Sequence, residues 1–207
     1  MKESVRPAVE SDVDGIIRVC NHAWDGIWQG ECQMFLDRIR TFPECGIVVG
    51  EIDGVIEGYV SVQLADNDTI FRPTWNEGTD FGCFVKTHTP QGVWLHGAGL
   101  AVTPKGSRAN LTGDLVRFLY EYAASQNKLG GRFITRIPGY YRFCETMTPE
   151  DYVSTLRNGK PIDPELRVMA RHGFHVVQPA VVFRDYVEGG GDPKSCGCSV
   201  LIDLLVK

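Results

Sequence analysis

The sequence predicts a single α/β domain that spans residues 1–207. Strand-like runs and segments of helical periodicity alternate along the whole chain. A buried strand, a short polar loop and an amphipathic helix follow one another directly over residues 92–126, as they do in folds that pack helices on a sheet. Of the 207 residues 43% are apolar, which is enough to bury one sizeable core.

The N-terminal half predicts one strand, two helices and a hairpin, in that order. Residues 5–9 form a short strand candidate, and residues 11–23 and 32–39 carry apolar stripes at helical spacing. Two β-rich runs between residues 46 and 64 are joined through Asp53-Gly54, which is a strong turn signal. Residues 66–91 are polar and contain prolines and glycines, so they predict a long loop, a kind of segment that is usually functional or mobile.

The unit at residues 92–126 has the order expected of an anion site. Val93–Val102 is apolar and β-branched, Pro104 ends the strand, and a helical period begins at Leu111. The first turn of a helix offers unpaired N–H groups and a partial positive charge, to which Lys105 and Arg108 add formal charge. The loop is therefore either a cradle for the pyrophosphate of a nucleotide-like cofactor or an ordinary connection from strand to helix.

The C-terminal half predicts three strands and two short helices. Residues 132–137 form a strand, and residues 176–183 and 199–206 form two more. Between the first two lies a segment at about 146–172 with two helix starts. Thr148-Pro149 and Asp163-Pro164 each combine a capping side chain with proline at the first helical position, followed by acidic residues.

The composition excludes several classes of function. A net charge of −5 argues against broad nucleic-acid binding, and no apolar run approaches the length that crosses a membrane. The seven cysteines are scattered and odd in number, so we expect reduced thiols and no metal site. The N-terminus lacks the apolar core of a signal peptide, and we expect a cytoplasmic protein. The sequence leaves the oligomeric state open.

This order of elements resembles the GNAT superfamily of acyl-CoA enzymes. The matching segments are VRPAVESDVDGI, the hairpin at Asp53-Gly54, LAVTPKGSRANLTGDL and ARHGF. The resemblance implies a mixed, mostly antiparallel sheet of about seven strands, splayed at the fourth, with helices on both faces. It also implies coenzyme A or an acyl-CoA as substrate. The residues expected to bind it are Leu100, Val102, Lys105, Arg108, Ala109, Asn110, Leu111, Thr112 and Gly113.

The loop departs from the family pattern, in which glycines recur after an arginine or glutamine. Here Arg108 is followed by Ala109-Asn110-Leu111-Thr112, and only Gly113 of the expected glycines is present. Leu111 occupies a position where close approach of a ligand to the backbone favours glycine.

The C-terminal half is similar to a narrower group, the GNAT-like domains of polyketide synthase loading modules of the curacin type. The matching residues are Thr135-Arg136, Tyr140-Tyr141, Asp163-Pro164-Glu165-Leu166-Arg167, His172-Gly173 and Phe183-Arg184. That resemblance implies decarboxylation of malonyl- or methylmalonyl-CoA in starter formation, with an acyl carrier protein as the partner that receives the acyl group. It assigns catalytic roles to Thr135, His172, Arg184 and Trp28, with Trp24 as the alternative tryptophan.

Three hypotheses of function follow. The first is a malonyl-type decarboxylase or loading enzyme, in which Thr135 orients an oxyanion, His172 supplies a proton and both converge with Arg184 and Trp28 on one pocket. The second is an acetyl-CoA-dependent N-acetyltransferase, and the third is a non-catalytic acyl-CoA-binding module. Each site residue also has a plain structural reading: His172 as a helix end, Thr135 as an ordinary strand residue, Arg184 as a solvated strand end and Trp28 as core.

Overall fold

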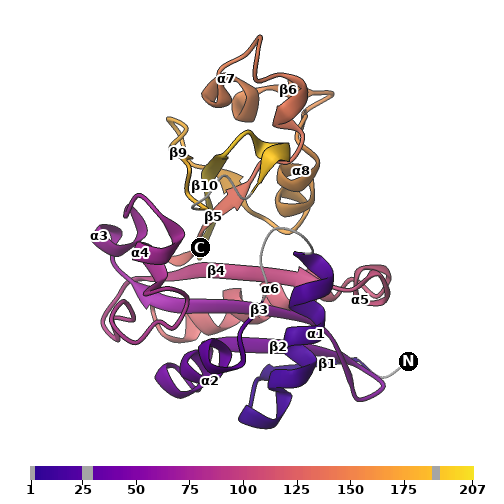
Figure 1. The fold of residues 1–207 in the computed structure, drawn as a ribbon, viewed down its shortest axis with the longest axis vertical. Coiled ribbons are helices and arrows are strands. Elements are labelled where there is room, and N and C mark those ends of the chain that lie inside the picture. Colours follow the sequence, from indigo (N-terminus) through magenta and orange to yellow (C-terminus); the bar gives the residue numbers. More distant parts are fainter. Residues whose placement is uncertain (1–2, 25–29, 188–191) are drawn as a thin grey trace.

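The computed structural model describes residues 3–24, 30–187 and 192–207, which form one eight-stranded sheet with helices around it (Figure 1). The strands of the sheet are β1 Glu3–Pro7, β2 Ile47–Ile52, β3 Val55–Ala65, β4 Trp94–Val102, β5 Gly130–Arg136, β8 His175–Val176, β9 Val182–Arg184 and β10 Cys198–Leu205. A separate hairpin pairs β6 Leu156–Arg157 with β7 Lys160–Pro161.

Eight α-helices lie between these strands in the described part of the chain. They are α1 Val13–Ala23, α2 Cys32–Thr41, α3 Asn67–Ile70, α4 Trp75–Thr79, α5 Pro104–Arg108, α6 Leu111–Ser125, α7 Pro149–Ser154 and α8 Pro164–Arg171. Three single 3₁₀ turns are η1 Glu10–Asp12, η2 Tyr140–Arg142 and η3 Pro193–Ser195. The long polar segment after β3 therefore contains two short helices, α3 and α4, where the sequence predicted only a loop.

The sheet is mostly antiparallel, as expected. Its order is β1-β2-β3-β4-β5-β10-β8, with β9 also paired to β10, and only the β4–β5 pair is parallel. The sequence predicted about seven strands. The additional strand arises because residues 176–183, expected as one strand, form β8 and β9 on either side of Gln178-Pro179. Proline has no N–H to donate to a ladder, so the pairing is interrupted there.

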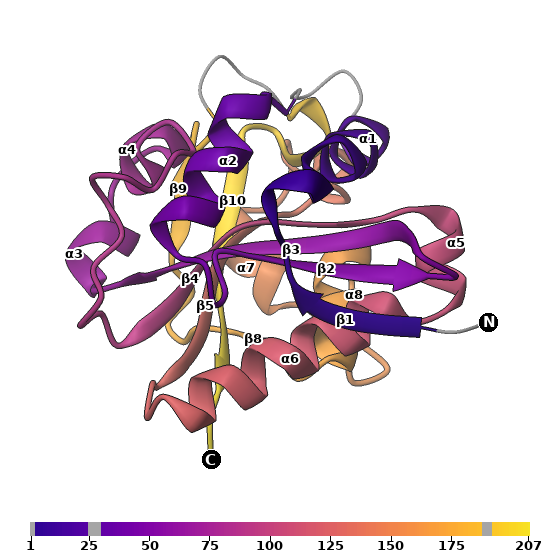
Figure 2. The ribbon, with the colours of Figure 1, turned by 90° about the horizontal axis from the view of Figure 1, so that it is seen from below.

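Helices cover both faces of the sheet. Figure 2 shows α1 and α2 on one side and α6 on the other. The helical period expected from Leu111 onward is present in α6, whose face toward the sheet buries the apolar residues Leu111, Leu115, Val116, Leu119 and Ala123. The chain's helices thus form because each apolar stripe has a sheet face to cover.

The local turn and cap signals are confirmed. Asp53 and Gly54 both have positive φ, 54° and 79°, which is the conformation of a two-residue hairpin turn. The Thr148 side chain accepts a hydrogen bond from the Asp151 amide and so caps α7. Asp163 caps α8 in the same way. These signals are local, and they therefore survive in the folded chain without help from tertiary contacts.

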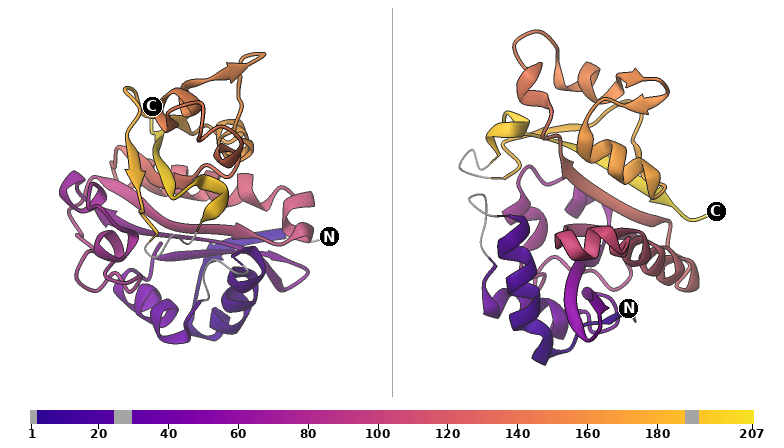
Figure 3. Two further views of the ribbon diagram at one scale, coloured as in Figure 1. Left: turned by 45° about the horizontal axis from the view of Figure 1, so that its top comes forward. Right: turned by 90° about the vertical axis from the view of Figure 1, so that its right-hand side faces the viewer.

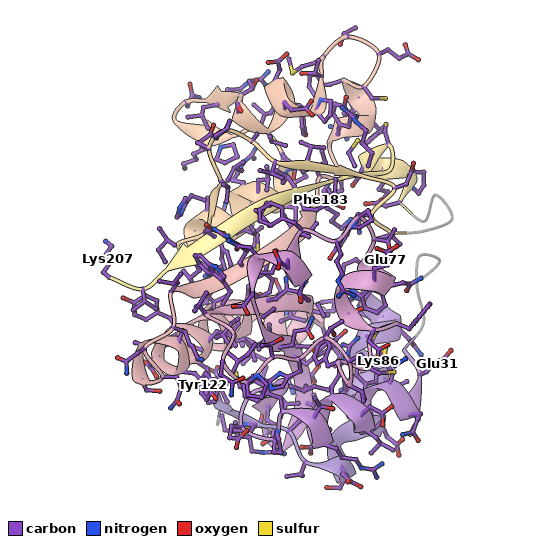
Figure 4. The ribbon with its side chains drawn as sticks, turned by 90° about the vertical axis from the view of Figure 1, so that its left-hand side faces the viewer. Glu31, Glu77, Lys86, Tyr122, Phe183 and Lys207 are labelled. Atoms are coloured by element: carbon purple, nitrogen blue, oxygen red, sulfur yellow. The ribbon has the colours of Figure 1, made fainter. Side chains whose placement is uncertain are left out.

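The sheet parts in the middle. β4 and β5 are paired only from Trp94 opposite Gly130 to Gly97 opposite Phe133. Beyond that point β5 continues with β10 in the upper half of Figure 1, whereas β4 continues with β3 in the lower half. The expected splay at the fourth strand is thus present. Phe183 of β9, labelled in Figure 4, spans part of the gap, because its ring stacks on Phe71 beside α3 at 6.4 Å.

The edge of β4 is open beyond this parting. The register of β3 against β4 shifts by one residue between Ser61 and Val62, so Ala98 has no partner on β3. No described residue of β5 pairs with β4 past Gly97. The Ala98 carbonyl accepts a hydrogen bond from the Trp75 indole N–H at 3.1 Å. The other backbone groups of β4 that point toward β5 past Gly97 have no partner on that strand and could pair with an extended ligand with amide groups.

Asp163 joins the elements that follow β5. Its buried carboxylate accepts four hydrogen bonds: from the Gly139 amide at 2.9 Å, the Tyr152 hydroxyl at 3.0 Å, and the amides of Glu165 and Leu166 at 2.8 and 3.1 Å. One side chain thus fixes α7, α8 and the turn after β5 relative to one another.

We expect Asp163→Ala to lower the free energy of unfolding by about 3 kcal/mol or more, because four donors lose a buried charged acceptor. Chemical denaturation of the variant and the parent protein measures this. Asp151→Ala, at an exposed position of α7, is the control and should cost no more than about 1 kcal/mol. Equal stability of the two variants would contradict this role of Asp163.

Candidate functional site

A cavity of about 140 Å³ lies where β4 and β5 part, and we call it the central cavity. On the side of α1 and α2 it is lined by Trp24, Arg38, Tyr59 and Trp75. Residues 97–100 of β4 and 133–136 of β5 form its walls, and Glu165 and Met169 of α8 line it from the other side. The C-terminal part of the chain contributes residues 186–187, 192 and 197–199.

Arg38 places a fully buried positive charge in this cavity. Its side chain is 0% exposed, and its guanidinium donates to the Gly82 carbonyl at 2.5 Å, the Ser61 hydroxyl at 3.2 Å and the Met34 sulfur at 3.2 Å. All three acceptors are neutral. No described carboxylate forms an ion pair with it, and two of its five N–H groups have no acceptor among the described residues.

Aromatic rings surround the same guanidinium. Its central carbon lies 4.9 Å from the ring centroid of Phe84, 5.3 Å from that of Phe35 and 5.8 Å from that of Trp75. Burial lowers the pKa of Arg38 to about 10, so the side chain remains protonated near neutral pH. A buried charge without a counter-ion costs several kcal/mol, unless a ligand supplies the opposite charge.

Sequence reasoning missed Arg38, although a signal was present. The buried residues of α2 are Met34, Phe35, Arg38 and Ile39, at the spacing of an apolar helix face. An arginine on such a face is unusual, and it marks a charge that the fold takes into its interior.

Glu165 faces the central cavity from the first turn of α8. Among the described residues its carboxylate has no hydrogen-bond or ion-pair partner. Burial raises its pKa, an effect that the nearby Arg136 opposes and Asp163 adds to. An acid at the second position of a helix is so common that the sequence gives no sign of this role.

Arg136 and Asp192 are two further charged residues that line the central cavity together with Glu165. Two guanidinium nitrogens of Arg136 donate to the two carboxylate oxygens of Asp192, at 2.9 and 2.7 Å. Thr135, the preceding residue, is half-buried and lines the cavity on β5. The charge of Arg136 is therefore largely balanced by Asp192, whereas that of Arg38 is not.

Tyr186 and His96 carry the buried polar side-chain atoms that lack a partner in the described structure. The Tyr186 hydroxyl and His96 Nε2 lie 3.7 and 3.8 Å from the point that a Cβ on Gly78 would occupy. His96 Nδ1 donates to the Arg132 carbonyl at 3.2 Å, and burial lowers the pKa of His96 to about 4. His96 is therefore a neutral, buried histidine. Tyr186 lines the central cavity, and its hydroxyl is buried near Gly78.

A second, polar cavity of about 400 Å³ lies at the loop between β4 and α6, and we call it the loop cleft. Ser107, Asn110 and Thr112 line it from the loop, and Val168, Arg171 and His172 line it from α8. The right-hand view of Figure 3 shows α8 over α5 and the start of α6. The two cavities thus share α8. Its Glu165 and Met169 line the central cavity, and its Val168 and Arg171 line the loop cleft.

The loop offers fewer amides than the sequence suggested, because residues 104–108 form α5. The amides of Ser107, Ala109 and Asn110 donate to backbone carbonyls within the loop, and that of Gly106 donates to the Thr103 hydroxyl. Those of Leu111 and Thr112, at the start of α6, have no backbone acceptor among the described residues. Leu111 is fully buried and does not line the loop cleft, whereas Thr112 does. The Thr112 amide is therefore the one that an anion in the loop cleft can use.

The side chains of the loop also differ in role. Leu111 is fully buried and packs toward Gly50 and Gly106, so it does not obstruct the cleft. The Lys105 ammonium lies 3.7 Å from the Glu57 carboxylate, whereas Arg108 is exposed. The added charge at the cleft comes from Arg171, which the sequence analysis did not select.

The expected convergence of Thr135, His172 and Arg184 on one pocket is not observed. Thr135 lines the central cavity, but His172 follows the last turn of α8 and lines the loop cleft. Arg184 is exposed and pairs with Glu150 at 3.3 Å. The reason is geometric: α8 turns Glu165 and Met169 toward Thr135, so His172 lies past the end of the face that reaches it.

Trp28 lies outside the described residues. Trp24, the alternative, lines the central cavity, and its ring centroid is 5.8 Å from the guanidinium carbon of Arg136.

His172, at the loop cleft, has a lowered pKa. Burial of its imidazole is the main cause, and the positive charge of the neighbouring Arg171 adds to it.

Within the described ranges, no group of three His, Cys, Asp or Glu side chains could hold a metal ion. In the same ranges, no helix combines the length and the apolar character needed to cross a membrane.

The sequence has distant relatives in Bacillus subtilis (strain 168), and no family profile matches it. It is 28% identical over 178 residues to "Probable hydrolase YhcX", which covers 86% of this chain but only 34% of that protein. It is 27% identical over 210 residues to "Uncharacterized N-acetyltransferase YkwB", which covers 97% of this chain and 87% of that protein.

Solved structures match over nearly the whole chain. The loading GNATL domain of CurA from Lyngbya majuscula superposes with a TM-score of 0.85 at 20% identity, over 99% of this chain and 98% of that one. The GphF GNAT-like decarboxylase, solved in complex with isobutyryl-CoA, gives 0.80 at 23% identity, over 99% and 100%. The chain therefore has the GNAT fold, in a form similar to the curacin-type loading and decarboxylase domains.

Proposed function

We propose that the protein decarboxylates a malonyl- or methylmalonyl-type acyl-CoA. The buried, unpaired Arg38 in the central cavity is the observation that carries this proposal. The cavity needs a negative charge, and a carboxylated acyl group brings one. The likeness to a loading domain and a decarboxylase across the full fold agrees with this choice.

Coenzyme A fits along the face that joins the two cavities. Its diphosphate would lie in the loop cleft, against the free amide of Thr112 and the charge of Arg171. Its amide-containing arm would follow the open edge of β4 past Leu100 and Val102, and the thioester would then reach the central cavity.

The charge of Arg38 also discriminates between substrates. At about 5–6 Å and an effective dielectric constant of about 20, two unit charges interact by about 3 kcal/mol. This energy favours a carboxylate in the cavity and opposes an ammonium, which is the usual acceptor of an N-acetyltransferase. The neutral hydrogen-bond acceptors around Arg38 cannot reverse that preference.

The reaction uses the thioester as electron sink. The bond between the α-carbon and the carboxylate breaks, CO₂ leaves, and the electron pair moves into the thioester carbonyl to give an enolate. Thr135 is placed on β5 to donate a hydrogen bond to an oxygen in the cavity. The negative charge stays inside the cavity throughout, within the field of Arg38, until a proton reaches the α-carbon.

An acetyl-CoA-dependent N-acetyltransferase is the second candidate. The identity with YkwB and the unpaired Glu165, which could accept a proton from an amine, favour it. A non-catalytic acyl-CoA-binding module is the third.

One product assay separates the three. The protein is incubated with methylmalonyl-CoA, and separately with acetyl-CoA and a panel of amines, and products are identified by mass. We expect CO₂ and propionyl-CoA from the first incubation and no acetylated amine from the second. Acetyl transfer without CO₂ release would establish the second candidate, and CoA binding without any product the third. Adding an acyl carrier protein tests whether the propionyl group passes to its thiol.

Arg38→Gln should weaken binding of S-(2-carboxyethyl)-CoA, a thioether that cannot lose CO₂, by tenfold or more, which corresponds to about 1.4 kcal/mol. Binding of the neutral S-propyl-CoA should change little. Calorimetric titration measures both, and Arg38→Lys, which keeps the charge, should recover part of the loss. An equal loss for both ligands would mean that Arg38 serves only to hold α2 in place.

Arg171→Gln should weaken binding of coenzyme A itself by about tenfold, since it removes a charged donor from the diphosphate. Arg157→Gln, which removes the same charge from the β6–β7 hairpin, is the matched control and should leave the affinity unchanged. A loss in Lys105→Gln with none in Arg171→Gln would move the diphosphate to the other side of the loop.

A further inference from the structure

The proton that ends the decarboxylation needs a donor inside the central cavity, and His172 is not there. This inference rests on the proposed function, because only a carbanion-like product requires the proton. The donor must reach the α-carbon, carry a proton near neutral pH and be screened from water. The described titratable side chains around the cavity can be compared on these three points.

Most of them are already engaged. Arg136 and Asp192 are held by each other, and Asp192 also accepts a hydrogen bond from the Ser195 hydroxyl. Cys198 is next to the exposed guanidinium of Arg184. Burial raises the pKa of Tyr59 and of Tyr186 far above neutrality, which makes both poor proton donors.

Glu165 meets all three requirements, and we propose that it is the proton donor. Glu165 lines the cavity from α8, and Thr135 lines it from β5. It has no hydrogen-bond partner among the described residues that would hold its proton or fix its orientation elsewhere. The neighbouring Met169 is buried and makes the wall next to Glu165 apolar.

The substrate itself prepares the donor. Burial already favours the neutral acid, the Asp163 carboxylate on the same helix reinforces this, and Arg136 on β5 opposes it. The carboxylate of the bound acyl group adds a further negative charge in the cavity and raises the pKa of Glu165 again. Binding therefore takes up a proton. After CO₂ leaves, Glu165 gives that proton to the α-carbon, its carboxylate is left ionised, and solvent restores it when the product departs.

Proton uptake can be measured without turnover. Calorimetric titration with S-(2-carboxyethyl)-CoA in buffers of different ionisation enthalpy should show proton uptake by the parent protein near neutral pH. Glu165→Gln should show none, and neither protein should take up a proton with S-propyl-CoA. Glu150→Gln, which removes an exposed carboxylate from α7, should behave as the parent.

The stereochemistry of the product tests the transfer itself. With methylmalonyl-CoA in D₂O, the parent protein should deuterate one face of the α-carbon, and its rate should fall as pH rises through the pKa of Glu165, because the acid form is required. In Glu165→Gln we expect a rate lower by about 10²-fold or more and deuteration of both faces of the α-carbon. The rate of this variant should no longer fall as the pH rises. The rate of Glu165→Asp should still fall as the pH rises, because this variant keeps a carboxylic acid at the same position.

The two proposals fail differently. If the parent protein releases no CO₂, the proposed function is wrong. If it does, and Glu165→Gln keeps the same pH profile and the same product stereochemistry, Glu165 is not the donor. Loss of stereospecificity in Tyr186→Phe, with none in Glu165→Gln, would assign the proton to the tyrosine and overturn the inference in the same way.

Discussion

The parting of β4 from β5 is the constraint on which the rest of the structure depends. A Cβ on Gly97 would lie 2.0 Å from a ring carbon of Phe133, so the aromatic ring occupies the space where a side chain would stand. Gly97 and Phe133 are also the last paired residues of the two strands. Past this pair the sheet divides, and the gap between its halves becomes the central cavity, bordered by an open backbone edge.

Two ionisable side chains that line this cavity, Arg38 and Glu165, determine its electrostatics. Arg38 enters from the face covered by α1 and α2, and Glu165 enters from α8. The first is charged and has no described counter-ion, whereas burial drives the second toward its neutral form. A substrate carboxylate between them would be attracted by Arg38 and would raise the pKa of Glu165, which then takes up a proton from solvent. The cavity is thus suited to a reaction in which a negative charge moves and a proton is then delivered.

The fold could be predicted because its signals are local. Asp53-Gly54, Thr148-Pro149 and Asp163-Pro164 fix turns and helix starts through backbone geometry and capping alone, and the folded chain keeps all three. The helices in residues 66–91 were missed because each has only one or two turns, too few for a periodic pattern. The break at Gln178-Pro179 was missed because the flanking residues are apolar enough for one strand.

The site was predicted only in part, for a different reason. Thr135 could be placed beside the cavity because the resemblance assigned it a site role and it lies near the end of β5, the strand next to the parting. His172 was assigned to the same pocket, but which face of α8 turns inward depends on how Asp163 anchors that helix to Tyr152 and Gly139, and this is a tertiary contact. Arg38 was missed because its functional position depends on a cavity whose other lining residues come from several distant parts of the sequence, from Trp24 to Ser199.

The most direct test of the account is a crystal structure of the protein with S-(2-carboxyethyl)-CoA. The account predicts that the carboxylate lies in the central cavity within about 6 Å of the Arg38 guanidinium, with the sulfur beside the open edge of β4 and the diphosphate against the amide of Thr112. A carboxylate in solvent, with Arg38 still unpaired and the acyl arm outside the parting of the strands, would contradict it.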